Sequence, residues 1–251
     1  MATKPKAPAT STAVAVKKPV SGNIVSIQDA LKAQAALMGS RTAPATGAAI
    51  RLSPGKFTLP DGTTTPGPLE LVIVDFTSKN AFYEGAYDPK NISPPACFAI
   101  GNDIKNMVPS PNSPKAQASD CASCPMNQFG SDGDGKACKN SRLMAVLPPD
   151  ADADTPMWTL ATSPTANKGF DGHVASVARI FEMPPIGVVT SVSLDPNTTY
   201  AKLMFSDPQP NANVGVHFAR QEEARVMLAV EPDVSGFESK AKAKPKAGGR
   251  R

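Results

Sequence analysis

The chain has 251 residues, of which 26 are Pro and 18 are Gly, and 41% of its residues are hydrophobic. This length could hold one or two domains, but so much Pro, Gly, Ser, Thr and Ala predicts long loops around one folded domain. No stretch approaches the roughly 20 apolar residues that span a bilayer, and the N-terminus lacks the apolar run of a signal peptide. We therefore expect no membrane segment and a cytoplasmic location.

Basic residues are concentrated at the two ends of the chain. Residues 1–20 carry four lysines and no acid, and residues 240–251 carry four lysines, two arginines and no acid. Without these ten cations, 16 basic side chains face 22 acidic ones, a net charge of −6, although the whole chain has a net charge of +4. Basic arms on an acidic core can reach nucleic-acid phosphates by counterion release. Arms that only keep the protein in solution are the alternative.

The N-terminal part predicts a flexible arm followed by a short helix. Residues 1–22 lack hydrophobic periodicity, and we expect a disordered basic arm there. Ser26 precedes IQDALKAQAALM, in which Asp29 takes the third helical position and Gly39 ends the pattern, so residues 27–38 are a predicted helix. With the linker that follows, this helix makes up the segment 23–49. Residues 234–251 are predicted to be a disordered basic tail.

Residues 50–233 are predicted to form the folded domain. Short apolar or alternating runs separated by turn residues are typical of strands, and they occur in AIRLS, KFTL, LELVIVDFTSKNAFYE, SRLMAVLPP and PMWTLATS. VVTSVSL and TTYAKLMFS form a predicted hairpin around Asp195-Pro196-Asn197. Helices are predicted from Pro164 to Phe181 and over FARQEEARVMLAV.

This order of elements predicts a mainly β protein with a few helices. Five or more short strands without βαβ alternation favour a small antiparallel barrel or sandwich over a Rossmann-like sheet. An OB-like barrel with an inserted zinc-binding loop is our first choice.

Four cysteines indicate a metal site within the long irregular segment 94–140. A loop of this length in a compact domain needs a physical reason, and metal ligation supplies one. Cys121 and Cys124 form a Cys-x-x-Cys pair, with 23 residues between Cys97 and the pair and 13 between the pair and Cys138. Zinc prefers four thiolate or imidazole ligands in a tetrahedron. We therefore predict a structural Zn²⁺ bound by Cys97, Cys121, Cys124 and Cys138.

Three alternatives to zinc stay open: an iron–sulfur cluster, reduced structural cysteines, and disulfides. The spacing does not follow the ferredoxin pattern, and four cysteines are too few for a disulfide scaffold in a chain of this length. Four Cys ligands leave no open position for a catalytic zinc. The sequence also has no phosphate-binding loop, nucleophile elbow, His-Glu-x-x-His or paired catalytic carboxylates. We therefore expect a binding protein and not an enzyme.

The same region resembles a group of tailed-phage proteins. The matching features are, in order, Pro95-Ala-Cys97, Cys121-Ala-Ser-Cys124-Pro125, Gly130-Ser131 and Lys136-Ala-Cys138-Lys139 followed by an apolar strand. Members of this group look like phage single-stranded-DNA-binding proteins. The resemblance implies an OB-type barrel with a zinc-bearing loop that acts in DNA replication or recombination in the host cytoplasm. Its implied partners are single-stranded DNA and replication or recombination proteins.

The C-terminus departs from that pattern. Replicative single-strand binders commonly end in an acidic tail that recruits partner enzymes, whereas this chain ends in a basic one. The departure puts partner recruitment by the C-terminus in doubt.

Sequence-independent binding of single strands needs aromatic faces for the bases and cations for the backbone. Tyr83 and Tyr87 are the predicted stacking residues, because a phenol tolerates a wet surface better than Phe does. Predicted phosphate contacts come from the first long strand and from the cysteine segment: Lys79, Lys105, Lys136, Lys139 and Arg142. Ordinary packing of the rings and solvated surface lysines are the alternatives.

We therefore expect binding of single-stranded DNA without sequence preference. A zinc-stabilised structural or protein-interaction module with basic tails is one alternative, and the acidic core favours it. A double-strand or RNA-binding regulator that reads through a zinc ribbon is another, but the sequence shows no clear recognition helix.

Overall fold

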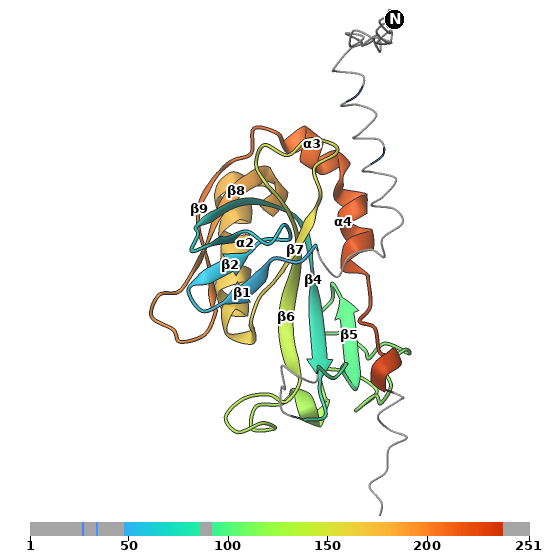
Figure 1. Cartoon of the computed structure of the whole chain (residues 1–251). Helices are drawn as coiled ribbons and strands as arrows, with labels where there is room; N and C mark the ends of the chain where they lie inside the picture. The colour runs from blue at the N-terminus through green and yellow to red at the C-terminus, as the bar shows by residue number, and fades with distance from the viewer. Residues whose placement is uncertain (1–26, 28–33, 35–47, 86–91, 238–251) are drawn as a thin grey trace, which may run out of the picture. The chain divides into compact units, whose positions relative to one another are not determined.

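The computed structural model describes Ile27, Gln34 and residues 48–85 and 92–237 (Figure 1). The chain divides into two units, residues 1–45 and 46–251. In the first unit Ile27 and Gln34 are helical, and the rest of the helix predicted over 27–38 lies outside the described residues. The two basic arms, apart from residues 234–237, and Tyr87 also lie outside them.

The second unit is mainly antiparallel β-structure with a few helices, which confirms the predicted class. Its strands are β1 (Arg51–Ser53), β2 (Lys56–Thr58), β3 (Thr64–Thr65), β4 (Leu69–Phe82), β5 (Cys97–Gly101), β6 (Lys139–Leu147), β7 (Trp158–Ala161), β8 (Val188–Leu194) and β9 (Leu203–Pro210). Its helices are α2 (Asn167–Phe181), α3 (Val214–Ala219) and α4 (Gln221–Leu228). Single turns of 3₁₀-helix are η1 (Pro125–Asn127), η2 (Pro164–Ala166) and η3 (Pro185–Gly187).

The strands make two sheets. The small one has the order β1-β2-β3, and the large one has the order β7-β6-β4-β8-β9, with β5 also paired to β4. A parallel bridge between Ala49 and Thr159 joins the two sheets at β7. The described strands therefore follow an open path, and no closed barrel is formed among them.

Strand β4 is the centre of the large sheet. It pairs with β6 along one edge, and along the other edge it pairs first with β8 and then with β5. Leu71 and Ile73 point into one hydrophobic core, whereas Val72 and Val74 point into a second one. Burial on both faces explains why this strand begins as a continuous apolar run instead of an alternating one.

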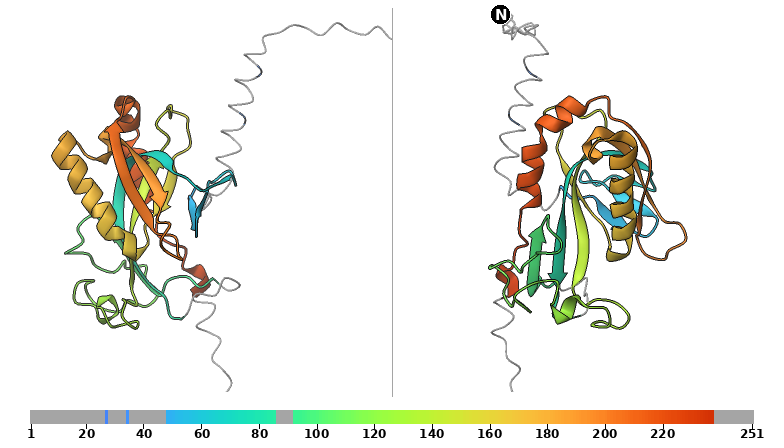
Figure 2. Two further views of the ribbon diagram at one scale, coloured as in Figure 1. Left: turned by 90° about the vertical axis from the view of Figure 1, so that its left-hand side faces the viewer. Right: turned by 180° about the vertical axis from the view of Figure 1, so that it is seen from behind.

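The first core lies between the large sheet, the small sheet and α2, with α2 and the β1–β2 hairpin on its two sides (Figure 2). Phe170 of α2 makes edge contacts with Phe76 and Phe205, at 5.0 and 5.2 Å between ring centroids. Such contacts add to the stabilisation that burial of the rings provides. Helix α2 ends at Glu182, which has a left-handed backbone with φ of 55°, two residues before Pro184. The predicted helix end is therefore confirmed.

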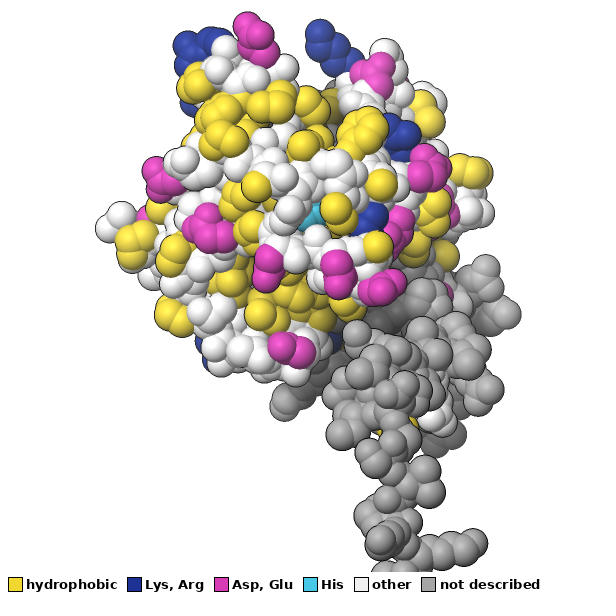
Figure 3. Space-filling model, turned by 90° about the horizontal axis from the view of Figure 1, so that it is seen from above, with side chains coloured by type: hydrophobic (Ala, Val, Ile, Leu, Met, Phe, Trp, Pro, Cys, Tyr) yellow, Lys and Arg dark blue, Asp and Glu magenta, His cyan; other side chains and the backbone are white. Residues whose placement is uncertain are grey.

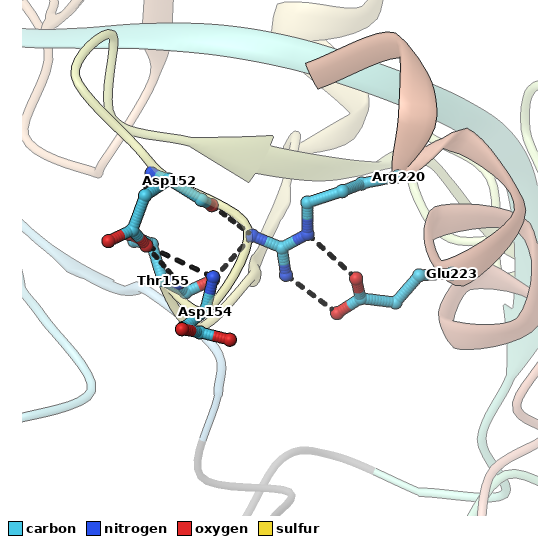
Figure 4. A network of polar contacts seen from close by, with 5 residues as sticks. All are labelled: Asp152, Asp154, Thr155, Arg220 and Glu223. Carbon is cyan, nitrogen blue, oxygen red and sulfur yellow. Dashed lines mark hydrogen bonds and ion pairs between the residues drawn. The ribbon is translucent and has the colours of Figure 1, made fainter. Parts of the chain in front are cut away.

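The second core is covered by α3 and α4, which replace the single helix predicted over 218–230. The chain turns between them at Arg220, whose guanidinium is largely buried (Figure 4). It donates to the backbone carbonyls of Asp152 and Thr155 at 3.2 and 2.5 Å and to the carboxylate of Glu223 at 2.8 Å. These bonds tie the β6–β7 loop to the start of α4. None of the helices among the described residues is long and apolar enough to cross a membrane.

Both histidines of the chain are buried in this framework, with exposed fractions of 7% for His173 and 0% for His217. His173 Nε2 lies 3.0 Å from the hydroxyl of Thr190. The amide of Asn211 donates to His217 Nδ1 at 2.9 Å, so this nitrogen must be unprotonated. Burial lowers the pKa of both imidazoles, because the charged form loses its hydration.

Acidification is expected to destabilise the protein through these two residues. Their folded-state pKa values lie below the unfolded value of about 6.5, so the stability is complete above that pH and is lost as the pH falls through the folded-state values. Each unit of lowering corresponds to about 1.4 kcal/mol. Urea unfolding at about pH 7.5 and pH 5.5 should show this loss in the wild type. The double variant His173→Gln/His217→Gln should show almost none, and an equal loss in both proteins would contradict the assignment.

Candidate nucleic-acid interface and cysteine cluster

The four cysteines line one cavity near the starts of β5 and β6, and these strands begin at the lower end of the large sheet in Figure 1. Cys97 is the first residue of β5, Cys124 precedes η1 and Cys138 precedes β6. All four are buried and line one small cavity of about 10 Å³, which is room for about one water-sized particle. The sequence prediction that these residues meet is therefore matched by their places in the fold.

Backbone hydrogen bonds hold the cysteine segment in place. Cys121 N–H donates to the carbonyl of Met107 at 2.9 Å, and Cys138 N–H donates to that of Met126 at 2.7 Å. The side-chain amide of Asn127 donates to the carbonyl of Cys121 at 2.6 Å. The segment between the cysteines contributes one small cluster of buried apolar residues, Ala99, Met107 and Cys121, so these polar bonds carry much of its order.

The cluster is a place where thiolates are costly without a cation. Burial, followed by the neighbouring Cys121, Cys124 and Cys97, raises the pKa of Cys138 to about 12. Burial also raises the pKa of Cys121, against a hydrogen bond from Asn80 that lowers it. Among the described residues, no group of three or more His, Cys, Asp and Glu side chains is arranged to hold a metal ion. Zinc therefore stays a prediction.

Two of the predicted lysines share one face of the sheet, opposite to the face on which Asn80 and Phe82 line the cysteine cavity. Lys79 of β4 pairs with Ser141 of β6, and Ala81 pairs with Lys139. Directly opposed residues in an antiparallel pair project to the same side, so Lys79 and Lys139 are diagonal neighbours on one face. Nearer the start of β4, the same face is covered by α4. Asp75 lies on this face and pairs with Ala145, which belongs to the second core. Tyr83, which follows the last residue of β4, is the next residue in this alternation. We call Lys79, Lys139 and Tyr83 the basic face.

Burial shifts the pKa of two side chains of the basic face. Lys79 is half-buried, and the loss of hydration lowers the pKa of its ammonium group. Tyr83 is 42% exposed, and burial of the rest of its side chain raises the pKa of its phenol. Lys139 is half-exposed, and its ammonium group bonds Asp132 at 2.8 Å. A phosphate group near Lys79 would restore the solvation that its charge has lost.

Arg142 lies on the opposite face of the sheet. Its side chain is only 9% exposed, and its guanidinium makes two bonds, at 2.9 and 2.8 Å, to the carboxylate of Asp171 in α2. The register places it opposite Ser78, one residue away from the row that carries Lys79. Arg142 therefore joins β6 to α2 and does not belong to the basic face.

The remaining predicted residues lie around the cysteine segment. Lys105 is exposed in the turn after β5, where its N–H donates to Asp103. Lys136 is half-buried, and its ammonium group stands 5.0 Å from the ring centroid of Phe129. Tyr87 lies outside the described residues.

Phe129 is a candidate that the sequence reasoning missed. Its side chain is 80% exposed, although burial of a large aromatic ring would stabilise the folded state. The turn below it is rigid: the hydroxyl of Ser131 donates to the carbonyls of Met126 and Gln128 and accepts from the N–H of Ala137. The sequence does contain a signal for an exposed ring, because Phe129 is a lone aromatic residue among Asn, Gln, Gly, Ser and Asp between two cysteines.

The end of the molecule that carries α3 has the opposite character. Seen from that end, acidic side chains are spread over the surface with apolar ones between them (Figure 3). The exposed acids there include Asp150, Asp152 and Asp154 of the β6–β7 loop. Phosphates would be repelled from this end, whereas the cysteine end mixes exposed lysines, such as Lys105 and Lys139, with exposed acids, such as Asp103, Asp132 and Asp134.

No protein-family model, curated protein or solved structure matches this chain.

The geometry predicts different costs for removing Arg142 and Lys139. Arg142→Gln should lower the free energy of unfolding by about 1–3 kcal/mol, because it removes two charge-assisted hydrogen bonds from a buried guanidinium to Asp171. Lys139→Gln removes a surface ion pair and should change it by less than about 1 kcal/mol. Urea denaturation measures both. Equal effects of the two substitutions would contradict the structural role of Arg142.

Proposed function

We propose that this protein binds single-stranded DNA without general sequence preference, on the basic face and the tip of the cysteine segment. Lys79 and Lys139 are neighbours on one face of the sheet, and the cysteine segment carries the exposed ring of Phe129. This combination of cations and an exposed ring is the observation that carries the proposal. Cations for the backbone and open aromatic faces for the bases are the two things that single-strand binding needs.

The roles follow from the chemistry of each side chain. Lys79 and Lys139 neutralise backbone phosphates, and Lys136 does so at the tip of the cysteine segment. Tyr83 and Phe129 offer rings on which bases stack, each stacked base contributing about 1–3 kcal/mol. Lys105 and Tyr87 stay predicted contacts next to this surface. The basic arms add attraction that is not specific to single strands.

The proposal includes a structural Zn²⁺ held by Cys97, Cys121, Cys124 and Cys138. Four buried thiols that line one small cavity supply the donor set that a closed four-sulfur site needs. A divalent cation would stabilise the thiolates that burial disfavours, and its binding would contribute folding free energy to the segment between β5 and β6.

The proposal also includes the phage-type, OB-like relation that the cysteine region suggests. Strand β4 is 14 residues long, has a bulge between Ile73 and Asp75, and changes partner on one edge from β8 to β5. A long bent strand shared by two halves of a sheet is what barrel-like curvature requires. In this reading the protein protects single strands during replication or recombination and does no chemistry itself.

A protein-interaction module is the second candidate. Helix α3, at the acidic end of the molecule, exposes the side chains of Val214, Val216 and Phe218. An apolar patch with an acidic surround is typical of a surface that meets another protein. The two functions are compatible because they use opposite ends of the same unit.

Loss of one cysteine is expected to release the metal. Cys121→Ser should abolish bound zinc and lower the thermal midpoint, because the segment then loses the ligand that orders it. Ala122→Ser, a change of the exposed neighbour, is the control and should leave both unchanged. Metal analysis of the purified proteins and thermal unfolding measure the result. Metal-free wild-type protein, or iron in place of zinc, would overturn the zinc assignment.

Binding of a fluorescent oligo-dT to the full-length chain tests the DNA interface. Phe129→Ala should weaken it about 5- to 150-fold through the loss of one stacked base. Lys79→Gln should reduce the slope of log affinity against log salt by about 0.7, because one phosphate contact is lost. Lys168→Gln, which removes an exposed lysine of α2, is the control.

Duplex DNA should compete poorly with the oligo-dT. If the wild type binds duplex equally well, or if both variants bind like the control, then the basic arms alone bind nucleic acid. The interaction-module reading would then take the place of the proposed function.

A further inference from the structure

A second cavity lies on the open edge of β4, and its lining comes from β4, from the end of β5 and from the end of α4. On this edge β4 is paired with β8 up to Leu71 and with β5 from Ser78 onward, so a gap of several residues separates the two partners. The cavity has a volume of about 200 Å³. This is below the roughly 300–1,000 Å³ of pockets for whole drug-sized ligands and suits a single flat ring system.

The walls of this cavity combine apolar side chains with hydrogen-bond acceptors. Ile100 and Leu228 provide aliphatic walls, and Asp75 and Thr77 provide the polar groups on β4. One oxygen of Asp75 accepts the N–H of Phe76 at 2.8 Å, and the other lies 3.5 Å from the guanidinium of Arg225. A carboxylate has about four lone-pair positions, so Asp75 keeps two for a ligand. The last carbonyls of α4 add further negative potential at the rim.

The cavity continues the basic face. Asp75, Thr77 and Lys79 alternate along β4 on the same side, and Ile100 pairs directly with Lys79. Alternate residues of a strand are about 6.6 Å apart, which is similar to one nucleotide of an extended strand. A DNA strand whose phosphate sits at Lys79 therefore brings a neighbouring base to the cavity mouth. Arg225, which is more than half exposed at this mouth, is placed to meet the next phosphate.

We propose that this cavity is a base subsite that takes one guanine of the bound strand, with Asp75 as the residue that selects it. Guanine presents two adjacent donors, N1–H and the 2-amino group, which match the two oxygens of a carboxylate. Thymine offers one donor between two carbonyls, and those carbonyls would face the carboxylate. The subsite adds preference at one position to binding that is otherwise independent of sequence, and it rests on the proposed function.

The test compares a dT oligonucleotide of about 12 residues, within the range of OB-fold site sizes, with the same oligonucleotide carrying one central dG. The full-length wild type should bind the dG form about 5- to 150-fold more tightly, the discrimination expected of one bidentate pair. Asp75→Asn, whose amide puts a donor where guanine needs an acceptor, should remove the preference for the dG form over the dT form. Glu70→Gln changes an exposed acid at the other end of the same strand and should keep the preference.

A second variant blocks the cavity without touching the carboxylate. Ala229→Phe places a ring at an exposed rim position and should also remove the preference for dG. Equal binding of both oligonucleotides by the wild type would overturn the subsite while the proposed function stands, and so would a preference that survives in both variants. Failure of the wild type to bind either oligonucleotide would overturn the proposed function itself.

Discussion

Strand β4 is buried on both faces from Leu71 to Val74, and the rest of the structure depends on this constraint. Leu71 and Ile73 anchor the core under α2, and Val72 and Val74 anchor the core under α4. Each fully buried aliphatic side chain contributes about 1.5–3 kcal/mol, so one short run holds two layers of helix in place. Beyond the bulge the strand becomes polar, with Thr77, Ser78, Lys79 and Asn80 in succession. The same strand thus passes from core to candidate site within a few residues.

The distribution of charge reconciles an acidic domain with a nucleic-acid partner. The part of the chain between the basic ends has a net charge of −6, which by itself would repel phosphates. At physiological ionic strength, however, exposed charges are screened beyond about 8 Å, so a strand responds to the side chains next to it. The acids of the β6–β7 loop lie at the α3 end, whereas the cysteine end carries Lys79, Lys136 and Lys139 together with the exposed acids Asp103, Asp132 and Asp134. Net charge is therefore a poor guide to this surface.

Elements with a strong local signal could be predicted from the sequence. The Pro164 start and Pro184 stop bracket α2, and the β8–β9 hairpin forms as predicted, except that β9 begins at Leu203 and not at Thr198. Strand β5 was not predicted, because CFAIG is short and lies within a segment rich in Pro, Asn and Ser; its order comes from pairing with β4. The final helix divides at Arg220, where side-chain bonds to a distant loop outweigh helix propensity.

The site was harder to predict than the fold for a related reason. The Cys-x-x-Cys spacing is a local pattern, and it led directly to the cluster. Whether a cation faces a ligand or a neighbouring acid depends on register, which sequence spacing does not reveal. Lys139 and Arg142 are three residues apart and therefore lie on opposite faces of β6, but the spacing does not show that the side chain of Arg142 is buried against Asp171 of α2 whereas Lys139 stays at the surface. The cavity beside Asp75 depends on a bulge and on the end of α4, and neither has a sequence signature.

The position of the cysteines suggests how a metal would influence DNA binding without contacting DNA. Cys97 begins β5 and Cys138 immediately precedes β6, so the cluster fixes the starts of the two strands that flank the lower half of β4. The backbone bond from Cys138 to Met126 also sets the base of the turn that carries Phe129. Disorder in the cluster would shift Lys139, Ile100 and Phe129 relative to Lys79, and a binding surface that is a few ångströms out of register loses its complementarity. A structural ion would therefore act on affinity through the register of the sheet, and not through its own charge.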